Sequence, residues 1–318
     1  MKKIYLLLLL VLLISFLTAD KYAGEIFKLR AGVRNYALGN TGVTDINSYA
    51  TAYWNPAILP LVKQKGIEFM HAEEYNGLLK YDTINFRGNS DFPFSAVITR
   101  IGINDIPITK LNDEQAELSN DNRPYIDRYV DNSDYVLYLG YGSAVNDKFY
   151  IGATPKLVYR RLVEENGYGF GMDIGVLYMI SDNFLTGLKI NDAFTTQIIW
   201  PNSDKEAVIP SFDLEFSYLH NFDKKGLKAI RGVGMAEIIT DFAEDDITVQ
   251  LGDLGVDFHA GIEYVATENL QLMVGYDIDN LTAGIGFNIN KYILNYAYEH
   301  ELEDELDNSH RISAGVKF

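Results

Sequence analysis

The last nine residues, His310 to Phe318, carry the pattern that most limits how this chain folds. In an extended strand, successive side chains point to opposite faces. One face would therefore be apolar and the other small or polar, with Ile312, Ala314, Val316 and Phe318 on the first and Arg311, Ser313, Gly315 and Lys317 on the second. The pattern predicts that the chain ends in an amphipathic β-strand whose last residue is aromatic.

Similar segments recur from Gly66 onward. We count about fourteen, each near the 9–11 residues that cross a bilayer in a tilted strand. The predicted strands are Gly66–Glu73, Leu79–Phe86, Phe94–Ile103, Asp134–Tyr141, Phe149–Tyr159, Tyr168–Met179, Phe184–Asn191, Ser211–His220, Leu227–Ile239, Gly255–Val265, Leu270–Asp277, Leu281–Ile289, Tyr292–His300 and His310–Phe318. A soluble β-sandwich alternates in the same way, so periodicity alone does not choose between the two folds.

The lengths of the connections do distinguish a membrane barrel from a β-sandwich. Those after even-numbered strands are short, as in Ser181–Asn183, Ala266–Asn269 and Asn290–Lys291. Those after odd-numbered strands are mostly long, namely Asn104–Ser133, Asp192–Pro210, Thr240–Leu254 and Glu301–Ser309, with short exceptions at Glu74–Leu78 and Ile278–Asn280. Short turns at one end and long loops at the other are typical of outer-membrane barrels. Residues 66–318 are therefore predicted to form an all-β, transmembrane antiparallel β-barrel of about 14 strands.

The carboxyl-terminal strand also resembles the closing strand of bacterial outer-membrane barrels. In those proteins the final aromatic residue is an assembly signal. The resemblance implies that Phe318 is read by the barrel assembly machinery, and that outer-membrane lipid surrounds the finished barrel.

The amino terminus is predicted to be a cleavable signal peptide, residues 1–19. Lys2 and Lys3 precede an apolar run from Ile4 to Leu17, and the small residue Ala19 precedes Asp20. The alternative is an anchoring helix, but the run is shorter than the roughly 20 apolar residues that span a bilayer. Export in this way predicts a location in the outer membrane of a Gram-negative-type bacterium.

Composition excludes several classes of function. The formal net charge of −17 argues against a nucleic-acid partner, because phosphate binding needs a basic surface. The chain has no Cys. It contains neither a Gly-x-Ser-x-Gly nor a His-Glu-x-x-His motif, so no enzyme activity, cofactor or metal site is predicted. Acidic clusters at 241–246 and 301–307 are interpreted as solvated surface, with divalent-cation binding as the alternative.

Residues 20–65 do not look like barrel wall. They are rich in Gly, Asn and small residues, and Pro56 restricts both its own backbone and that of Asn55. The segment also carries aromatic side chains, Tyr36, Tyr49, Tyr53 and Trp54, which need a buried environment. The alternative is a tail or linker outside the barrel.

A motif in this segment resembles the amino-terminal plug of FadL-like outer-membrane proteins, the long-chain fatty acid transporter superfamily. The pattern is Gly-x-Arg-x-x-x-Leu-Gly-x-x-Gly, then about ten residues, then Tyr-Trp-Asn-Pro-Ala. The matching residues are Gly32, Arg34, Leu38, Gly39, Gly42, Tyr53, Trp54, Asn55, Pro56 and Ala57. The stretch Gly102–Pro107 is similar to an element of the PorV/PorQ branch. The chain departs from the family pattern at Asn40, Thr41 and Ile58.

The resemblance implies that residues 20–65 form a plug inside the barrel, and that passive transport or binding of a hydrophobic small molecule depends on it. Alternation along the strands places candidate partners of the plug in the lumen, namely Lys156, Asp173, Asp213, Glu215, Asp257, Glu263 and Arg311. The interpretation that we favour for these charges is a solvated or plug-bracing network with no ligand role. Two other functions stay open. One is a type IX-like secretion component that docks exported proteins, as the PorV/PorQ branch implies, and the other is a structural outer-membrane protein.

Overall fold

The structure is a computed structural model of the 318-residue chain, and it describes residues 24–163, 165–201, 204–222, 228–240, 247–300 and 308–318. The predicted signal peptide lies outside the described residues. Within them, the amino-terminal segment contains the short helices α2 (Glu25–Lys28), α3 (Val33–Ala37), α4 (Thr51–Trp54) and η2 (Pro56–Leu61). None of the described helices is long and apolar enough to cross a membrane.

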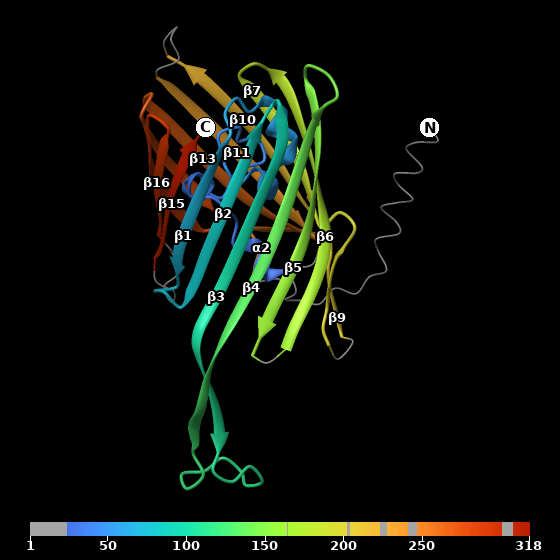
Figure 1. The fold of residues 1–318 in the computed structure, drawn as a ribbon, viewed down its shortest axis with the longest axis vertical. Coiled ribbons are helices and arrows are strands. Elements are labelled where there is room, and N and C mark those ends of the chain that lie inside the picture. The colour runs from blue at the N-terminus through green and yellow to red at the C-terminus, as the bar shows by residue number, and fades with distance from the viewer. Residues whose placement is uncertain (1–23, 164, 202–203, 223–227, 241–246, 301–307) are drawn as a thin grey trace, which may run out of the picture.

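Fourteen of the described strands form a closed antiparallel barrel (Figure 1). Around the ring they are β1 (Gly66–Glu74), β2 (Leu79–Asn89), β3 (Phe92–Leu111), β4 (Pro124–Ala144), β5 (Phe149–Leu162), β6 (Glu165–Ser181), β7 (Phe184–Asn191), β10 (Ser211–Asn221), β11 (Ala229–Ile239), β13 (Leu254–Thr267), β14 (Leu270–Asp277), β15 (Asn280–Ile289), β16 (Tyr292–His300) and β17 (Ser309–Lys317). The ring closes where β17 pairs with β1, from Gly66 opposite Lys317 to Glu73 opposite His310. The predicted all-β barrel of 14 strands is thereby confirmed.

The alternation seen in the sequence becomes an inner and an outer face. Along β17, Arg311 and Ser313 are buried, whereas Ile312 between them is 56% exposed. The same holds around the ring, where exposed apolar side chains on the outer face include Phe69, Ile84, Ile98, Leu157, Phe216, Ile262, Val274 and Leu294. The outer surface of the wall is therefore apolar, and its inner surface is polar.

One predicted loop is wrong. Residues 104–111 and 124–133 are not loop, because β3 and β4 continue as strands of 20 and 21 residues. The pairing of β3 with β2 ends at Gly102 and Lys80, and the pairing of β4 with β5 ends at Ser133 and Arg161. Past these residues, β3 and β4 pair with each other alone among the described strands. They project from the wall as a hairpin (Figure 1). The left-handed backbone at Asp105 and the register shift beside it interrupt the alternation that marks a strand in sequence.

Three short strands were also missed in the predicted loops. The hairpin of β8 (Thr196–Ile199) and β9 (Lys205–Val208) lies within the predicted loop Asp192–Pro210, and β8 pairs with β6. β12 (Val249–Leu251) pairs with the start of β13. At four residues or fewer, these strands are too short to show a period in sequence.

The amino-terminal segment, residues 24–65, lies inside the barrel. Helix α3 contacts β14 to β17, α4 contacts β2 to β4, and η2 contacts β2 to β6, so the segment touches opposite parts of the ring. Its side chains form nearly half of the buried apolar core, with Val33, Ala37, Leu38, Ala52 and Trp54 each at most 1% exposed. The core of this molecule is thus made between the segment and the wall.

Candidate functional site

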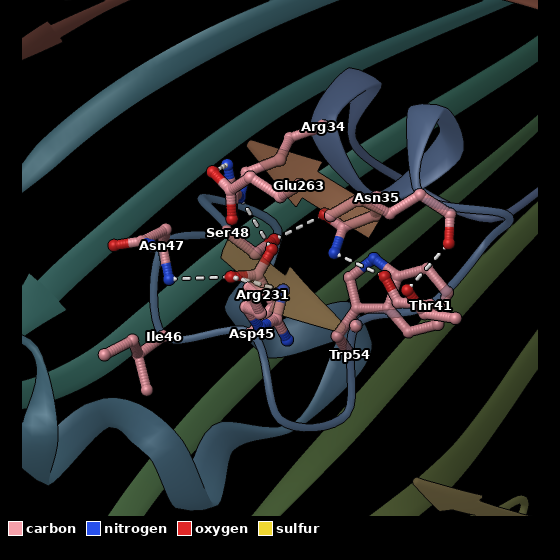
Figure 2. A network of polar contacts seen from close by, with 12 residues as sticks. Arg34, Asn35, Thr41, Asp45, Ile46, Asn47, Ser48, Trp54, Arg231 and Glu263 are labelled. Atoms are coloured by element: carbon pink, nitrogen blue, oxygen red, sulfur yellow. Dashed lines mark hydrogen bonds and ion pairs between the residues drawn. The ribbon is translucent and has the colours of Figure 1, made fainter. Parts of the chain in front are cut away.

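The candidate site is the contact zone between the amino-terminal segment and the inner face of the barrel. At its centre, Arg34 binds two carboxylates (Figure 2). Its Nε donates to Asp45 Oδ2 at 2.8 Å, and Nη1 and Nη2 donate to the two oxygens of Glu263 on β13 at 2.6 and 2.5 Å. A guanidinium that engages a carboxylate through two parallel hydrogen bonds fixes orientation as well as charge. Arg34 therefore ties the segment to one side of the wall.

Asp45 is held between two arginines. Arg231 on β11 places Nη1 3.5 Å from Asp45 Oδ1, on the side away from Arg34. Burial raises the pKa of the Asp45 carboxyl, but attraction to Arg34 and Arg231 and the hydrogen bond from Arg34 outweigh burial, so this pKa lies below its ordinary value. Asp45 is thus an anion that links the segment to a second wall strand.

Glu215 on β10 binds the backbone of the segment directly. Its carboxylate accepts hydrogen bonds from the N–H groups of Gly42, Val43 and Thr44 at 2.8, 2.9 and 2.9 Å, and from the Thr44 hydroxyl at 2.5 Å. Consecutive N–H groups that converge on one anion form a concave anion site. A side chain at position 42 would collide with the Trp54 ring, so Gly42 is required by space.

Gly39 lies against a neighbouring part of the wall, on β13 and β14. Its φ of +66° is in the left-handed region that favours glycine. A Cβ there would stand 2.4 Å from the carbonyl oxygens of Ala260 and Tyr276. The neighbouring Asn40 side chain donates to Asp277, which also meets the ring of His259. The glycine allows the segment to reach the wall backbone closely enough for these contacts.

The Asn55-Pro56-Ala57 motif makes a further attachment to the wall. Asn55 Oδ1 accepts from the Ala57 N–H at 3.0 Å, which caps η2, and Pro56 occupies the first turn of that helix. Asn55 Nδ2 donates to Val43 O at 2.8 Å and to Val176 O on β6 at 3.1 Å. One side chain therefore joins η2, the loop before α4 and the wall.

The part of the wall that faces this motif carries a glycine on each of three neighbouring strands. A Cβ at Gly142 on β4 would lie 2.1 Å from Pro56 O, one at Gly152 on β5 2.6 Å from Ala57 N, and one at Gly175 on β6 2.0 Å from Asn55 Oδ1. We call these three residues the glycine face. Because no side chain intervenes, the Asn55-Pro56-Ala57 backbone packs on the strand backbones themselves.

A small cavity of about 100 Å³ remains beside α2, toward the end of the barrel that carries the long connections, which we call the loop end. Phe27, Tyr53 and Tyr138 line it together with buried charges. Lys156 binds Asp173 and Asp192 at 2.9 and 2.6 Å. Lys189 lies 3.6 Å from Asp173, and one oxygen of Asp213 has no hydrogen-bond partner among the described residues. The cavity is therefore aromatic on one side and charged on the other.

The structure places the predicted site residues as follows. The motif residues Gly32, Arg34, Gly39, Gly42, Trp54, Asn55, Pro56 and Ala57 are all buried within the barrel. The seven candidate lumen residues, Lys156, Asp173, Asp213, Glu215, Asp257, Glu263 and Arg311, are each at most 3% exposed.

These lumen residues do not form one cluster. Glu215 and Glu263 hold the segment, as does Arg311, which donates to Glu74 and to the Leu29 and Arg30 carbonyls. Lys156, Asp173 and Asp213 line the cavity beside α2. Asp257 accepts from Thr248 near the loop end.

Several contributors were not predicted from the sequence, among them Asp45, Lys189, Arg231, Glu237 and Asp277. Lys189, Arg231 and Glu237 share the inward alternation of their strands, so the rule that selected the seven candidates would also have selected them. Asp45 lies in the amino-terminal segment, which has no strand alternation from which its inward position could be predicted.

No group of three or more potential metal-ligating side chains occurs within the part of the chain that the structure describes. The acidic clusters at 241–246 and 301–307 lie outside that part. The question of divalent cations at those loops is therefore separate from the site inside the barrel.

Solved structures resemble this fold at low sequence identity. The Ralstonia pickettii toluene transporter TbuX is 12% identical with a TM-score of 0.53, and the alignment covers 91% of this chain and 97% of TbuX. The CymD monoaromatic hydrocarbon channel is 12% identical with a TM-score of 0.51, over 91% and 97% of the two chains. The P. putida toluene transporter TodX is 12% identical with a TM-score of 0.50, over the same shares.

No family model matches the sequence. No curated protein matches it either. The likeness to TbuX, CymD and TodX is a likeness of fold, and it agrees with the FadL-like part of the predicted resemblance. The PorV/PorQ branch stays a prediction. The chain thus shares its fold with the toluene transporters TbuX and TodX and with the CymD channel, and its amino-terminal segment packs inside the barrel.

Proposed function

We propose that this protein is an outer-membrane barrel through which small hydrophobic compounds pass, and that residues 24–65 act as a movable plug. The observation that carries the proposal is that the segment fills a closed barrel yet adds no strand to it. The segment can therefore shift without breaking a single ladder of the wall.

The apolar outer face supports a place in the membrane. A closed barrel leaves no unpaired strand edge in its wall, which is what hydrocarbon surroundings demand. The outward side chains of neighbouring strands are apolar, as Phe69, Ile312 and Leu294 are on β1, β17 and β16. Charged residues on that face would destabilise a barrel surrounded by lipid.

The contacts of the segment support movement. They are hydrogen bonds and ion pairs made by Arg34, Asp45, Asn55 and Glu215, together with close packing of small residues. Such contacts break and re-form reversibly, because each contributes only about 0.5–3 kcal/mol in a folded protein. Displacement of the segment would join the cavity beside α2 to the rest of the interior.

The ligand class is proposed from two sources. The proteins with the same fold carry toluene or monoaromatic hydrocarbons by name. In this chain, aromatic rings line the cavity beside α2. The proposal is therefore a compound with an apolar body of aromatic size.

The test is uptake into cells that express the full chain in their outer membrane. Radiolabelled toluene should enter faster than in cells without the protein, and Asn55→Ala should change that rate at equal barrel abundance. Equal uptake with and without the protein would overturn the proposal.

The projecting hairpin favours a second function, the docking of an exported protein. Residues 105–111 and 124–131 expose Tyr125, Ile126 and Tyr129, and Leu118 at the tip is 72% exposed. A two-stranded ribbon without a covering layer is marginally stable by itself. If the hairpin is a docking arm, deletion of residues 105–131 removes co-purifying exported proteins and leaves toluene uptake intact. If the set of co-purifying proteins is unchanged by the deletion, the hairpin is not a docking arm.

A further inference from the structure

Among the described residues, the buried Arg and Lys side chains inside this barrel are paired with carboxylates, with one exception. Seven are at least nine-tenths buried in the described residues, namely Arg30, Arg34, Arg87, Lys156, Lys189, Arg231 and Arg311. Six of them have a carboxylate oxygen within 4.0 Å. Arg87 on β2 has none among the described residues. A buried charge without a counter-charge is costly unless something else neutralises it.

The surroundings of Arg87 hold the guanidinium in place without a direct ion pair, although the carboxylates of Asp45 and Glu68 attract it from beyond 4.0 Å. Its Nη1 donates to the carbonyl oxygens of Ile46 and Ser48 at 3.1 and 2.8 Å. Its Cζ lies over the ring of Tyr49, 4.0 Å from the ring centroid. Its Nε has no acceptor among the described residues. The group is therefore preorganised, with hydrogen-bonding capacity left over.

Arg87 lines a cavity of about 410 Å³ at the end of the barrel that carries the short turns, the turn end. Lys63 and Lys317 also line it, and neither has a carboxylate within 4.0 Å in the part of the chain described. The single carboxylate in the lining is Glu68, which already accepts from Asn295, Ser313 and Asn85. The lining thus holds more positive than negative charge, although the whole chain is strongly acidic.

We infer that this cavity is an oxyanion-binding site, with Arg87 as its anchor and Lys317 as a second cation. A carboxylate or phosphate group fits the planar guanidinium edge, which suits such anions better than an ammonium does. The group is either a free anion or the head of a molecule with an apolar chain, for which Ile46, Leu61 and Ile293 provide contact. The site lies across the segment from the cavity beside α2, so it goes beyond the proposed passage of hydrocarbons.

The experiment is calorimetry on the full chain in a non-ionic detergent with three probes, inorganic phosphate, decanoate and decanol. Wild-type protein should bind phosphate or decanoate. Arg87→Gln should weaken that binding by about tenfold or more, since a charged hydrogen-bonding partner is lost. Arg87→Lys should recover part of it, because the charge returns without the planar edge. Decanol should bind wild type and Arg87→Gln alike.

Two controls keep the test decisive. Arg100→Gln changes an arginine that pairs with Asp82 and lies outside this cavity, and it should leave anion binding unchanged. If Arg87→Gln fails to form the barrel, Lys317→Gln replaces it, with an expected loss of about threefold. Binding of phosphate alone identifies a free anion, and tighter binding of decanoate identifies an acid on an apolar chain. If neither anion binds, or if both bind the Arg87 and Lys317 variants as tightly as wild type, the inference is wrong.

Discussion

At the scale of single residues, the attachment of the segment depends on side chains that each satisfy several backbone groups. The side chain of Asn55 is fully buried and forms hydrogen bonds with the backbone of Ala57, Val43 and Val176. Glu215 serves three N–H groups in the same way. Removing such a side chain leaves buried donors or acceptors unpaired, which costs more than a typical hydrogen bond contributes.

Asn55→Ala should therefore loosen the segment without opening the barrel. The expected loss is about 1–3 kcal/mol of local stability. Hydrogen exchange should become faster for the amides of residues 32–59 and stay unchanged for those of the wall strands. Asn269→Ala, at an exposed turn, is the control, and equal protection in both variants would contradict the assignment.

Asp45 makes the attachment sensitive to acid. Its folded pKa lies below the unfolded value of about 3.8, so its contribution to stability is fully present above about pH 4. That contribution is lost as the pH falls through the folded pKa. With Trp200 replaced by Phe, Trp54 is the sole tryptophan, and its emission should shift to the red below pH 4. In Asp45→Asn this acid-induced shift should be smaller, and an identical shift would argue against Asp45.

At the scale of elements, the glycine face of β4 to β6 determines where the Asn55-Pro56-Ala57 motif can lie. Its members are not distinguished in sequence from other strand glycines. Gly232 on β11, for example, has open space where a side chain would go. The difference arises only because the segment packs on one set and not on the other.

Gly175→Ala should displace the motif, because the new methyl group would stand 2.0 Å from Asn55 Oδ1. The expected result is the same faster exchange of residues 32–59 as in Asn55→Ala. Gly232→Ala is the matched control and should behave as wild type. Normal protection in Gly175→Ala would mean that the motif does not rest on this face.

Phe318, which directly follows β17, is expected to act during assembly. The Phe318 side chain is 67% exposed, and its N–H donates to Lys65 O at 3.0 Å, a bond that any residue keeps. Phe318→Ala should therefore lower the amount of barrel in the outer membrane of cells but not the yield of refolding in detergent. Equal loss in both assays would indicate a structural role instead.

The strands were largely predictable from the sequence, since an apolar outer face and a polar inner face impose a period of two. Leu270–Asp277 and Tyr292–His300 match their observed bounds. The extensions of β3 and β4 were not predictable, because outside the wall neither face needs to be apolar. Residues 104–111 therefore lack the pattern that marked the rest of β3.

At the scale of the whole molecule, the inward orientation of the charged residues could be predicted, but their pairing could not. Arg34 and Glu263 are 229 residues apart, and their contact depends on how the segment is rotated within the ring. The period of the strand predicts that Glu263 points inward. It does not predict which cation binds Glu263. The same limit applies to Arg87, whose lack of a carboxylate within 4.0 Å among the described residues appears only once the interior charges of the structure are placed.

The central claim is that the segment must move for a compound to pass, and the absence of cysteine in the chain allows a direct test. Thr44 Oγ1 and Ser217 Oγ are 2.8 Å apart, one in the segment and the other on β10, so Thr44→Cys with Ser217→Cys should form a disulfide on oxidation. The measurement is toluene uptake by cells that carry this double variant, oxidised and then reduced, beside the two single variants. Uptake should stop in the oxidised double variant, return on reduction and persist in the single variants. Undiminished uptake with the disulfide fully formed would show that passage does not require the segment to leave β10.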